Sequence, residues 1–240
     1  MTEAEIDVSA DPAALAKRAA EWLVEQAEAS TGTFRISLSG GSTPRALYTL
    51  LAAEPLRARM PWDRVELFWG DERFVPPDDK DSNYRMTRET MLDHVPLKPE
   101  QIHRMPTEGT PEEAAAAYEA LLKRVYGSDR LDPSRPFFDV TLLGMGPDGH
   151  TASLLPESDV LEERSKWVAA VSQGRPEVRL TLTYPLIDSS RLVAFLLNGA
   201  EKAKAFAQIR SGDSSLPAGR VAPVGRVLWF VDRAVLEKDA

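Results

Sequence analysis

The sequence predicts an α/β fold of three layers, in which a mostly parallel, twisted sheet is flanked by helices in a Rossmann-like arrangement. Segments rich in β-forming residues alternate with segments of helical apolar spacing through most of the 240 residues. The 43% apolar content is enough for a sizeable core. No repeat, low-complexity tract or convincing linker interrupts the pattern. We therefore expect residues 1–240 to form a single domain.

The composition argues against several classes of protein. The chain has no cysteine, which removes disulfides, thiolate metal sites and a cysteine nucleophile. Its histidines, His94, His103 and His150, show no metal-ligand spacing, so no catalytic metal and no other cofactor is expected. The net charge of −8 argues against a nucleic-acid partner, although it permits a small anionic substrate. We read His94 and His103, which flank Pro-containing turns, as structural.

The location of the protein is predicted from what the chain lacks. No run approaches the ~20 apolar residues that a membrane span needs. The first ten residues, MTEAEIDVSA, are acidic and lack the apolar region of a signal peptide. We expect a soluble, cytoplasmic protein without membrane contact, present as a monomer or a weak homo-oligomer.

The expected elements follow the chain in alternation. The helix at 12–29 starts at Pro12 after Asp11, and its apolar stripe is typical of core packing. The helix at 111–126 has Pro111 early and Gly127 as its stop. The other expected helices are 45–53, 82–92 and 200–210, and the expected strands are 5–9, 33–38, 64–69, 138–143, 167–172, 178–184, 191–197 and 226–231.

The stretch 138–156, FDVTLLGMGPDGHTASLLP, is the strongest candidate for a functional loop. A run of β-formers passes into a Gly-rich loop, and we expect a short helical turn from Thr151. A buried strand, a loop and a helix place backbone N–H groups at the carboxyl end of a parallel sheet, where ligands bind. Asp148 and His150 lie in this loop, separated by Gly149. The alternative is a tight connection with a solvated histidine.

The segment SGGSTP at 39–44 also follows a strand and precedes a helix. Ser42 or Thr43 can cap this helix, with Pro44 in its first turn. Gly40 and Gly41 would let an anion reach the free N–H groups at the positive end of the helix dipole. An ordinary capped helix after a glycine turn is the alternative.

Charged residues occur at three other positions where a sheet edge or a helix start is expected. Asp71, Glu72 and Arg73 follow the strand at 64–69 and should stand at the sheet's carboxyl edge, with Glu72 on a solvated rim. Arg179 lies on a strand expected near the centre of the sheet, where a cation needs a partner or a wet pocket. Lys202 lies in the first turn of a helix, where the dipole disfavours a cation. A bound anion would compensate, while free solvation is the alternative that the bare sequence favours.

The sequence does not decide the role of two residues near the start of the 82–92 helix. Asn83 and Tyr84 could line a cleft, or they could merely cap the helix and pack against it.

Five motifs then occur in a recognisable order: LSGGSTPRALY, FWGDERFVP with SNYRM after it, FDVTLLGMGPDGHTASLLP, RLTLTYPLI and NGAEKAKA. Through them the whole chain resembles the glucosamine-6-phosphate isomerase/6-phosphogluconolactonase family. The isomerase branch typically continues DGHIAFNEP, which supplies a glutamate soon after the histidine. This chain continues TASLLP at 151–156, which favours the lactonase branch, and Glu157 comes too late to replace that glutamate.

The resemblance implies a sugar-phosphate enzyme of the oxidative pentose phosphate pathway, with the fold of that family. It would hydrolyse 6-phospho-D-glucono-1,5-lactone to 6-phospho-D-gluconate without a metal. The site residues that the resemblance implies are His150 as general base, Arg73 as a substrate contact, and a phosphate site of Gly40, Gly41, Ser42, Thr43, Arg179 and Lys202. Either Asp148 or Asp71 would orient the imidazole, and the oxyanion donor would be Arg73 or an N–H of residues 146–149.

Two rival interpretations remain at this point. An amino-sugar-phosphate isomerase or deaminase would use Asp71 as a base on carbon, and the missing downstream glutamate counts against it. A non-catalytic sugar-phosphate sensor would usually carry a nucleic-acid-binding module, and no basic helix-turn-helix segment is evident.

Overall fold

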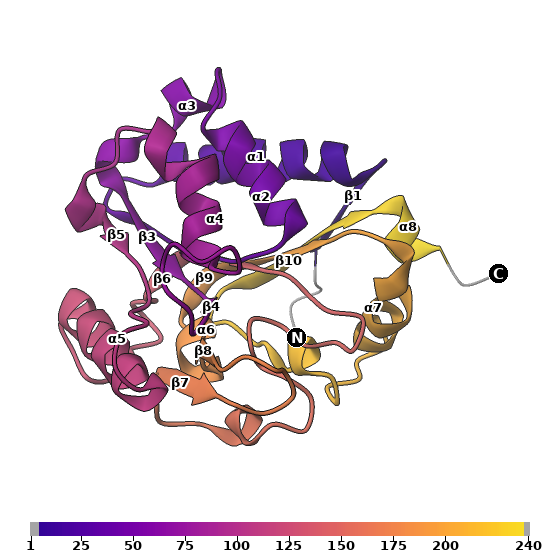
Figure 1. The fold of residues 1–240 in the computed structure, drawn as a ribbon. Coiled ribbons are helices and arrows are strands. Elements are labelled where there is room, and N and C mark those ends of the chain that lie inside the picture. The colour runs from indigo at the N-terminus through magenta and orange to yellow at the C-terminus, as the bar shows by residue number, and fades with distance from the viewer. Residues whose placement is uncertain (1–4, 238–240) are drawn as a thin grey trace.

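A parallel sheet of seven strands forms the centre of the computed structural model, which describes residues 5–237 (Figure 1). Its strand order is β1-β10-β9-β6-β2-β3-β5, and every neighbouring pair is parallel. The strands are β1 (Glu5–Ser9), β10 (Arg226–Asp232), β9 (Ser190–Leu197), β6 (Phe138–Leu143), β2 (Phe34–Leu38), β3 (Val65–Trp69) and β5 (Ile102–His103). The predicted fold class, a mostly parallel sheet flanked by helices, is confirmed.

Helices cover both faces of this sheet (Figure 1). One layer holds α1 (Pro12–Ala29), α2 (Ser42–Leu51), α3 (Leu56–Arg59) and α4 (Asn83–Thr90), and the other holds α5 (Pro111–Tyr126), α6 (Tyr184–Ile187) and α7 (Ala203–Arg210). The chain's last helix, α8 (Arg233–Leu236), follows β10. Short 3₁₀ turns lie at Trp62–Arg64, Leu92–His94, Pro99–Gln101, Asp159–Glu162, Ala200–Lys202 and Pro217–Arg220.

Two consecutive residues of β10 demonstrate the layering. Side chains of a strand alternate between its two faces. Phe230 packs edge-on against Trp22 of α1, with ring centroids 5.3 Å apart. Its neighbour Trp229 packs against Phe206 of α7 at 5.2 Å. The strand is therefore buried on both sides, which explains why its sequence is an apolar run instead of an alternating one.

A second, antiparallel sheet has the order β4-β8-β7, with β4 at Asp71–Arg73, β8 at Arg179–Leu182 and β7 at Val168–Val171. The expectation that β8 lies near the centre of the main sheet is wrong. The chain turns at Gly70, whose N–H donates to Leu38 in β2 (2.8 Å) and whose carbonyl accepts from Leu182 in β8 (2.8 Å). Because β4 pairs with a strand about 110 residues away in the sequence, short-range patterns do not indicate it.

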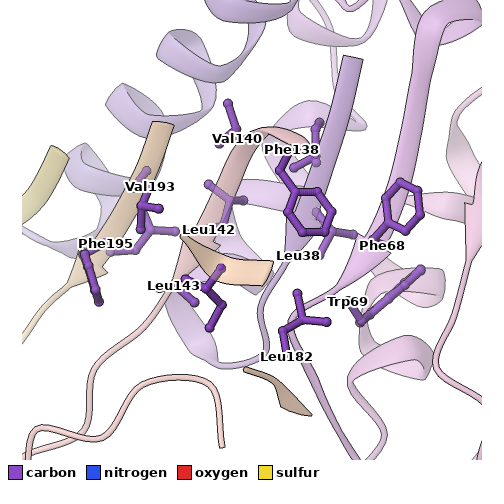
Figure 2. Close-up of a cluster of buried hydrophobic side chains, with 14 of the residues drawn as sticks. Leu38, Phe68, Trp69, Phe138, Val140, Leu142, Leu143, Leu182, Val193 and Phe195 are labelled. Atoms are coloured by element: carbon purple, nitrogen blue, oxygen red, sulfur yellow. The ribbon is translucent and has the colours of Figure 1, made fainter. Parts of the chain in front are cut away.

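The apolar core lies between the main sheet and its covering layers. Figure 2 shows side chains of β2, β3, β6 and β9 in one cluster with Leu182 of the small sheet. Phe68, Leu142, Phe195 and Leu182 are each fully buried. The small sheet is thus attached to the main sheet by apolar burial.

Elements with strong local signals lie where the sequence predicts them. β1, α1 and α5 have the predicted bounds. Asp11 caps α1 by accepting from the Ala14 N–H at 2.8 Å. Thr110 and Glu113 form a capping box at the start of α5, and Gly127 ends it in the left-handed conformation with φ 77°.

Two local predictions are wrong. No helical turn begins at Thr151: residues 151–154 form a turn in which Ala152 has φ 48°, outside the helical region. Neither Ser42 nor Thr43 caps α2 with its side chain. The N-cap position is Gly41, with φ 109°, and it has no side-chain hydrogen bond.

Candidate active site

A cavity of about 250 Å³ lies where the neighbouring strands β9, β6, β2 and β3 end. Loops that follow each of these strands contribute to its lining, as expected for the carboxyl edge of a parallel sheet. The structure brings together nine of the ten site residues singled out in the sequence: Gly40, Gly41, Ser42, Thr43, Asp71, Arg73, His150, Arg179 and Lys202. The tenth, Asp148, does not line the cavity but contacts His150, which does.

The loop after β2 presents the amino end of α2 to the cavity. Because the N-cap Gly41 has no side chain, the N–H groups of Ser42 and Thr43 carry no cap, and they lie at the positive end of a ten-residue helix. Tyr48 holds this loop against its own helix: its hydroxyl donates to the Ser39 carbonyl at 2.8 Å and accepts from the Ser39 N–H at 3.0 Å. The arrangement suits an anion at the helix terminus.

Thr43 makes a different bond from the predicted one. Its hydroxyl donates to Oδ1 of Asn198 at 2.6 Å, so it links α2 to the end of β9. Asn198 also lines the cavity, whereas the sequence predicts only a turn there. Gly40 is required here because a Cβ at this position would lie 2.0 Å from Oδ1 of Asn83.

Three cations border the cavity from separate elements. Arg73 of β4 and Arg179 of β8 are direct cross-strand partners, and the Nε atom of each is buried without a hydrogen-bond partner in the described part of the chain. An Nη of Arg73 donates to the Asp81 carbonyl at 2.6 Å, and Arg179 bonds to Glu177. Both arginines line the cavity, so their guanidinium groups place positive charge beside a ligand that binds there.

Lys202 is the third cation. It lies at the end of a 3₁₀ turn and directly before α7, close to its predicted position. It has no ion-pair partner among residues 5–237, and burial lowers its pKa even though Glu201 and Asp232 oppose the shift. A partly desolvated ammonium without a partner favours a bound anion.

His150 and Asp148 form a hydrogen-bonded pair at the Gly-rich loop after β6. Nδ1 of His150 lies 2.5 Å from Oδ1 of Asp148. Burial alone would raise the pKa of Asp148, but the hydrogen bonds from His150, with the charge of Arg175 as a smaller contribution, hold it below its usual range. An ionised carboxylate only accepts, so in the neutral imidazole Nδ1 carries the proton and Nε2 keeps its lone pair.

The Gly-rich loop after β6 leaves room for the His150–Asp148 pair. The Gly146 N–H donates to the His150 carbonyl at 3.0 Å, and the Gly149 N–H donates to the Gly146 carbonyl at 2.9 Å. A Cβ on Gly146 would lie 2.2 Å from the His150 ring and 2.7 Å from Asp148. Glycine at 146 is therefore a steric requirement of the histidine–carboxylate pair.

The structure separates two carboxylates that the sequence left as alternatives. Asp148 bonds to the imidazole, whereas Asp71 accepts from the Ser153 hydroxyl at 2.8 Å and lies 3.5 Å from the side-chain amide of Asn83. Asp71 still lines the cavity and is 7% exposed. It thus borders the cavity without a hydrogen bond to the histidine.

The prediction for Glu72 is wrong. It is not on a solvated rim but is 3% exposed, because the amino end of α4 lies over it and donates to its carboxylate. Sequence reasoning also missed Arg175, whose guanidinium lies 3.3 Å from both Asp148 and His150. A single arginine in a polar loop gives no signal in one sequence.

The two remaining histidines lie outside the cavity. His103 stacks on Phe68 with ring centroids 4.5 Å apart, and burial lowers its pKa. His94 contacts the Glu89 carbonyl at 3.0 Å through Nε2. Residues 5–237 contain no cluster of three or more side chains suited to holding a metal ion, and none of their helices has the length and apolarity to cross a membrane.

The fold and this cavity define an α/β protein in which three cations and a histidine that is paired with a carboxylate border one cavity. The family model described as glucosamine-6-phosphate isomerases/6-phosphogluconolactonase matches residues 10–229. The chain belongs to this family.

Two curated relatives are similar over most of their length. A 6-phosphogluconolactonase of Nostoc sp. is 39% identical over 237 residues, covering 95% of each chain. A 6-phosphogluconolactonase of Streptomyces coelicolor is 37% identical, covering 95% of this chain and 91% of the relative. The solved structure of 6-phosphogluconolactonase from Trypanosoma cruzi aligns with a TM-score of 0.86 at 30% identity, covering 98% of this chain and 97% of that one.

Proposed function

We propose that the protein hydrolyses 6-phospho-D-glucono-1,5-lactone to 6-phospho-D-gluconate, the second step of the oxidative pentose phosphate pathway. The observation that carries the proposal is that the His150–Asp148 pair shares one cavity with Arg179, Lys202 and the uncapped start of α2. A base and an anion site are what a phosphorylated lactone requires. The full-length similarity to enzymes named for this reaction supports the same conclusion.

The phosphate would bind at the cationic side of the cavity. Arg179 supplies a guanidinium and Lys202 an ammonium, each with a donor group that has no partner among residues 5–237. The glycines of the 39–44 loop allow the phosphate close to the N–H groups of Ser42 and Thr43. Charge-assisted hydrogen bonds of this kind are about twice as strong as neutral ones. Holding the phosphate fixes the distant lactone carbonyl against the base.

His150 would act as the general base. With Nδ1 donating to Asp148, Nε2 takes a proton from a water molecule as its oxygen attacks C1 of the lactone. The C1–ring-oxygen bond then breaks, and the imidazolium returns its proton to the departing ring oxygen. The added water thus supplies the new carboxyl oxygen and the hydroxyl hydrogen. Asp148 stabilises the imidazolium and fixes the tautomer.

Arg73 is the better candidate for the oxyanion donor. Of the loop residues 146–149, Gly146 and Gly149 already use their N–H groups within the loop, Pro147 has none, and Asp148 does not line the cavity. Arg73 lines the cavity, and its Nε is buried without a hydrogen-bond partner among residues 5–237. A preorganised donor in such a place stabilises negative charge as it develops.

A lactone hydrolysis assay coupled to 6-phosphogluconate dehydrogenase, run with EDTA, tests the proposal. We expect turnover well above spontaneous hydrolysis, and a loss of about 10²–10⁴-fold in kcat for His150→Asn with KM little changed. His94→Asn is the matched control, because His94 is exposed and outside the cavity. It should match the wild type.

Three outcomes would overturn the proposal. The wild type could lack turnover, His150→Asn could keep the wild-type rate, or EDTA could abolish activity and so refute the metal-independent mechanism. Ammonia release from glucosamine 6-phosphate would instead indicate the isomerase/deaminase activity, and binding without turnover would indicate a sensor. The cytoplasmic location, the absence of a nucleic-acid partner and the monomer or weak homo-oligomer stay predictions.

A further inference from the structure

Glu72 is a buried carboxylate beside the cavity that the proposed mechanism does not use. It is the central residue of the three-residue strand β4, and its neighbours Asp71 and Arg73 both line the cavity. Because side chains alternate along a strand, Glu72 points the other way. It does not line the cavity and is 3% exposed. Direct contact with a substrate is therefore not its role.

The carboxylate is satisfied entirely by hydrogen bonds from the strand and from the start of α4. Oε1 accepts from the N–H groups of Arg73 (2.8 Å) and Asn83 (2.7 Å). Oε2 accepts from the Tyr84 N–H (2.8 Å) and the Ser82 hydroxyl (3.1 Å). No lysine, arginine or histidine among residues 5–237 makes an ion pair with Glu72, although the positive end of the α4 dipole faces it.

Burial of the Glu72 carboxylate without a cation lowers the stability of the folded protein. Burial raises the pKa of Glu72, with the neighbouring Asp71 carboxylate contributing in the same direction, while the backbone donors oppose the shift. A buried carboxylate without a cation must be retained by the contacts that it organises. Those contacts join β4 to the first residues of α4.

Asn83, the first residue of α4, connects the Glu72 contacts to the residues that line the cavity. Its side-chain amide donates to the Asp71 carbonyl at 3.0 Å and lies 3.5 Å from the Asp71 carboxylate. Its Oδ1 lies against Gly40, where even a Cβ would be only 2.0 Å away. Asn83 therefore bridges β4 and the loop that precedes α2, and Glu72 fixes its backbone.

We propose that Glu72 is a positioning residue, which clamps the start of α4 to β4 so that Asn83, Asp71 and the Gly40 loop keep their places and Arg73 faces the cavity. The expected effect of Glu72 on turnover rests on the proposed lactone hydrolysis. The expected effect of Glu72 on the positions of Asn83, Asp71 and the Gly40 loop does not.

The kinetic part of the proposal is tested by measuring kcat and KM of Glu72→Ala and Glu72→Gln. The measurements are made at a temperature where circular dichroism shows that both variants are folded. We expect Glu72→Ala to lower kcat about tenfold or more, because an oxyanion donor displaced by a fraction of an ångström loses most of its effect. Glu72→Gln, which keeps one acceptor oxygen, should recover at least part of the loss.

Asp139→Asn is the matched control. Asp139 is a half-buried carboxylate that accepts the Arg35 N–H at 2.9 Å, away from the cavity, and burial raises its pKa as well. Its replacement should keep kcat and KM within about twofold of the wild type, as expected away from the catalytic groups. Wild-type kcat in folded Glu72→Ala, or an equal loss in Asp139→Asn, would overturn the proposal.

A double-mutant cycle and a crystal structure complete the test. If Glu72 acts through Asn83, the losses in Glu72→Ala and Asn83→Ala should not add in the double variant; full additivity would contradict the inference. If Glu72→Ala does not fold, Glu72→Gln replaces it in the cycle.

The crystal structure of the folded Glu72 variant separates this inference from the proposed function. Displacement of the Asn83 amide from Asp71 and Gly40 supports the positioning role even if the wild type has no lactonase activity. Retention of all these contacts refutes it.

Discussion

Arg73 and Arg179 lie directly opposite each other on the antiparallel strands β4 and β8, and both border the same cavity. Like charges in this cross-strand position are destabilising. Neither Nε has a hydrogen-bond partner among residues 5–237, and Glu177, which bonds to Arg179, also interacts with the charge of Arg73. The pair therefore concentrates positive charge at the expense of stability, which is the expected signature of an anion site.

Arg179→Ala should weaken phosphate binding without harming the fold. Loss of one charge-assisted contact, worth about 1.5–3 kcal/mol, raises KM about 10–100-fold. Inorganic phosphate should raise the Tm of the wild type and have a smaller effect on the variant. Steady-state kinetics and thermal shift measure both. Arg226→Ala, a change at an exposed arginine outside the cavity, is the control. An unchanged KM in Arg179→Ala would mean that the phosphate binds elsewhere.

Gly146→Ala should damage catalysis more than stability. The new Cβ would lie 2.2 Å from the His150 ring, so the imidazole and Asp148 must move. A displacement of this size costs about 10²-fold in kcat when it affects a reacting group. Gly32→Ala is the matched control, because a Cβ at Gly32 meets nothing within 4 Å. Equal rates for both variants would show that the His150–Asp148 geometry does not limit turnover.

Lys202 predicts a pH dependence of product binding. Its lowered pKa means that the free protein loses this proton at a lower pH than an ordinary lysine would require. A bound phosphate favours the ammonium, so affinity should be constant below the pKa of Lys202 and fall as pH rises through it. Calorimetry with 6-phosphogluconate measures this, with proton uptake on binding in the alkaline range.

Lys202→Arg supplies the comparison for that experiment. A guanidinium stays protonated throughout the accessible range, so the alkaline loss of affinity should disappear even if the overall affinity changes. The same alkaline loss in Lys202→Arg would assign the titration to another group.

Asp188 predicts a pH dependence of stability. Burial raises its pKa from 3.8 to about 6, while the bond from the Ala222 N–H opposes the shift. Between about pH 4 and 6 the folded protein binds more protons than the unfolded chain, so the free energy of unfolding contributed by Asp188 falls as pH rises. The ionised group then costs on the order of 2 kcal/mol at neutral pH.

Asp188→Asn should remove that cost, because its side-chain carbonyl can still accept the Ala222 N–H. We expect the variant to be more stable than the wild type at pH 7.5 by about 1–2 kcal/mol and to lose this advantage near pH 4. Urea unfolding at the two pH values measures the difference. A stability gap independent of pH would refute the raised pKa.

Local sequence was sufficient to predict the bounds of an element that carries its own start and stop signals. The capped helices α1 and α5 and the strand β1 have the predicted bounds, since caps, Pro and Gly act over a few residues. The conformation of the turn after His150 was not predicted correctly from local sequence. TASLL has no strong breaker, but Ala152 adopts a positive φ and the Ser153 N–H bonds to Thr181 of the small sheet. A tertiary contact overrode a weak local preference.

The sequence by itself determined the order of strands and helices, the loops that end at one sheet edge and the residue types gathered there. The resemblance to the family assigned nine residues separated by up to 162 positions to one site, and the structure places all nine around one cavity. Only the tertiary structure decided which carboxylate meets His150, that Glu72 is buried under α4, and that Arg73 opposes Arg179 in a second sheet. Each of these depends on hydrogen bonds or strand pairings between segments distant in sequence or on the packing of a helix over a strand, and a one-dimensional pattern does not contain that information.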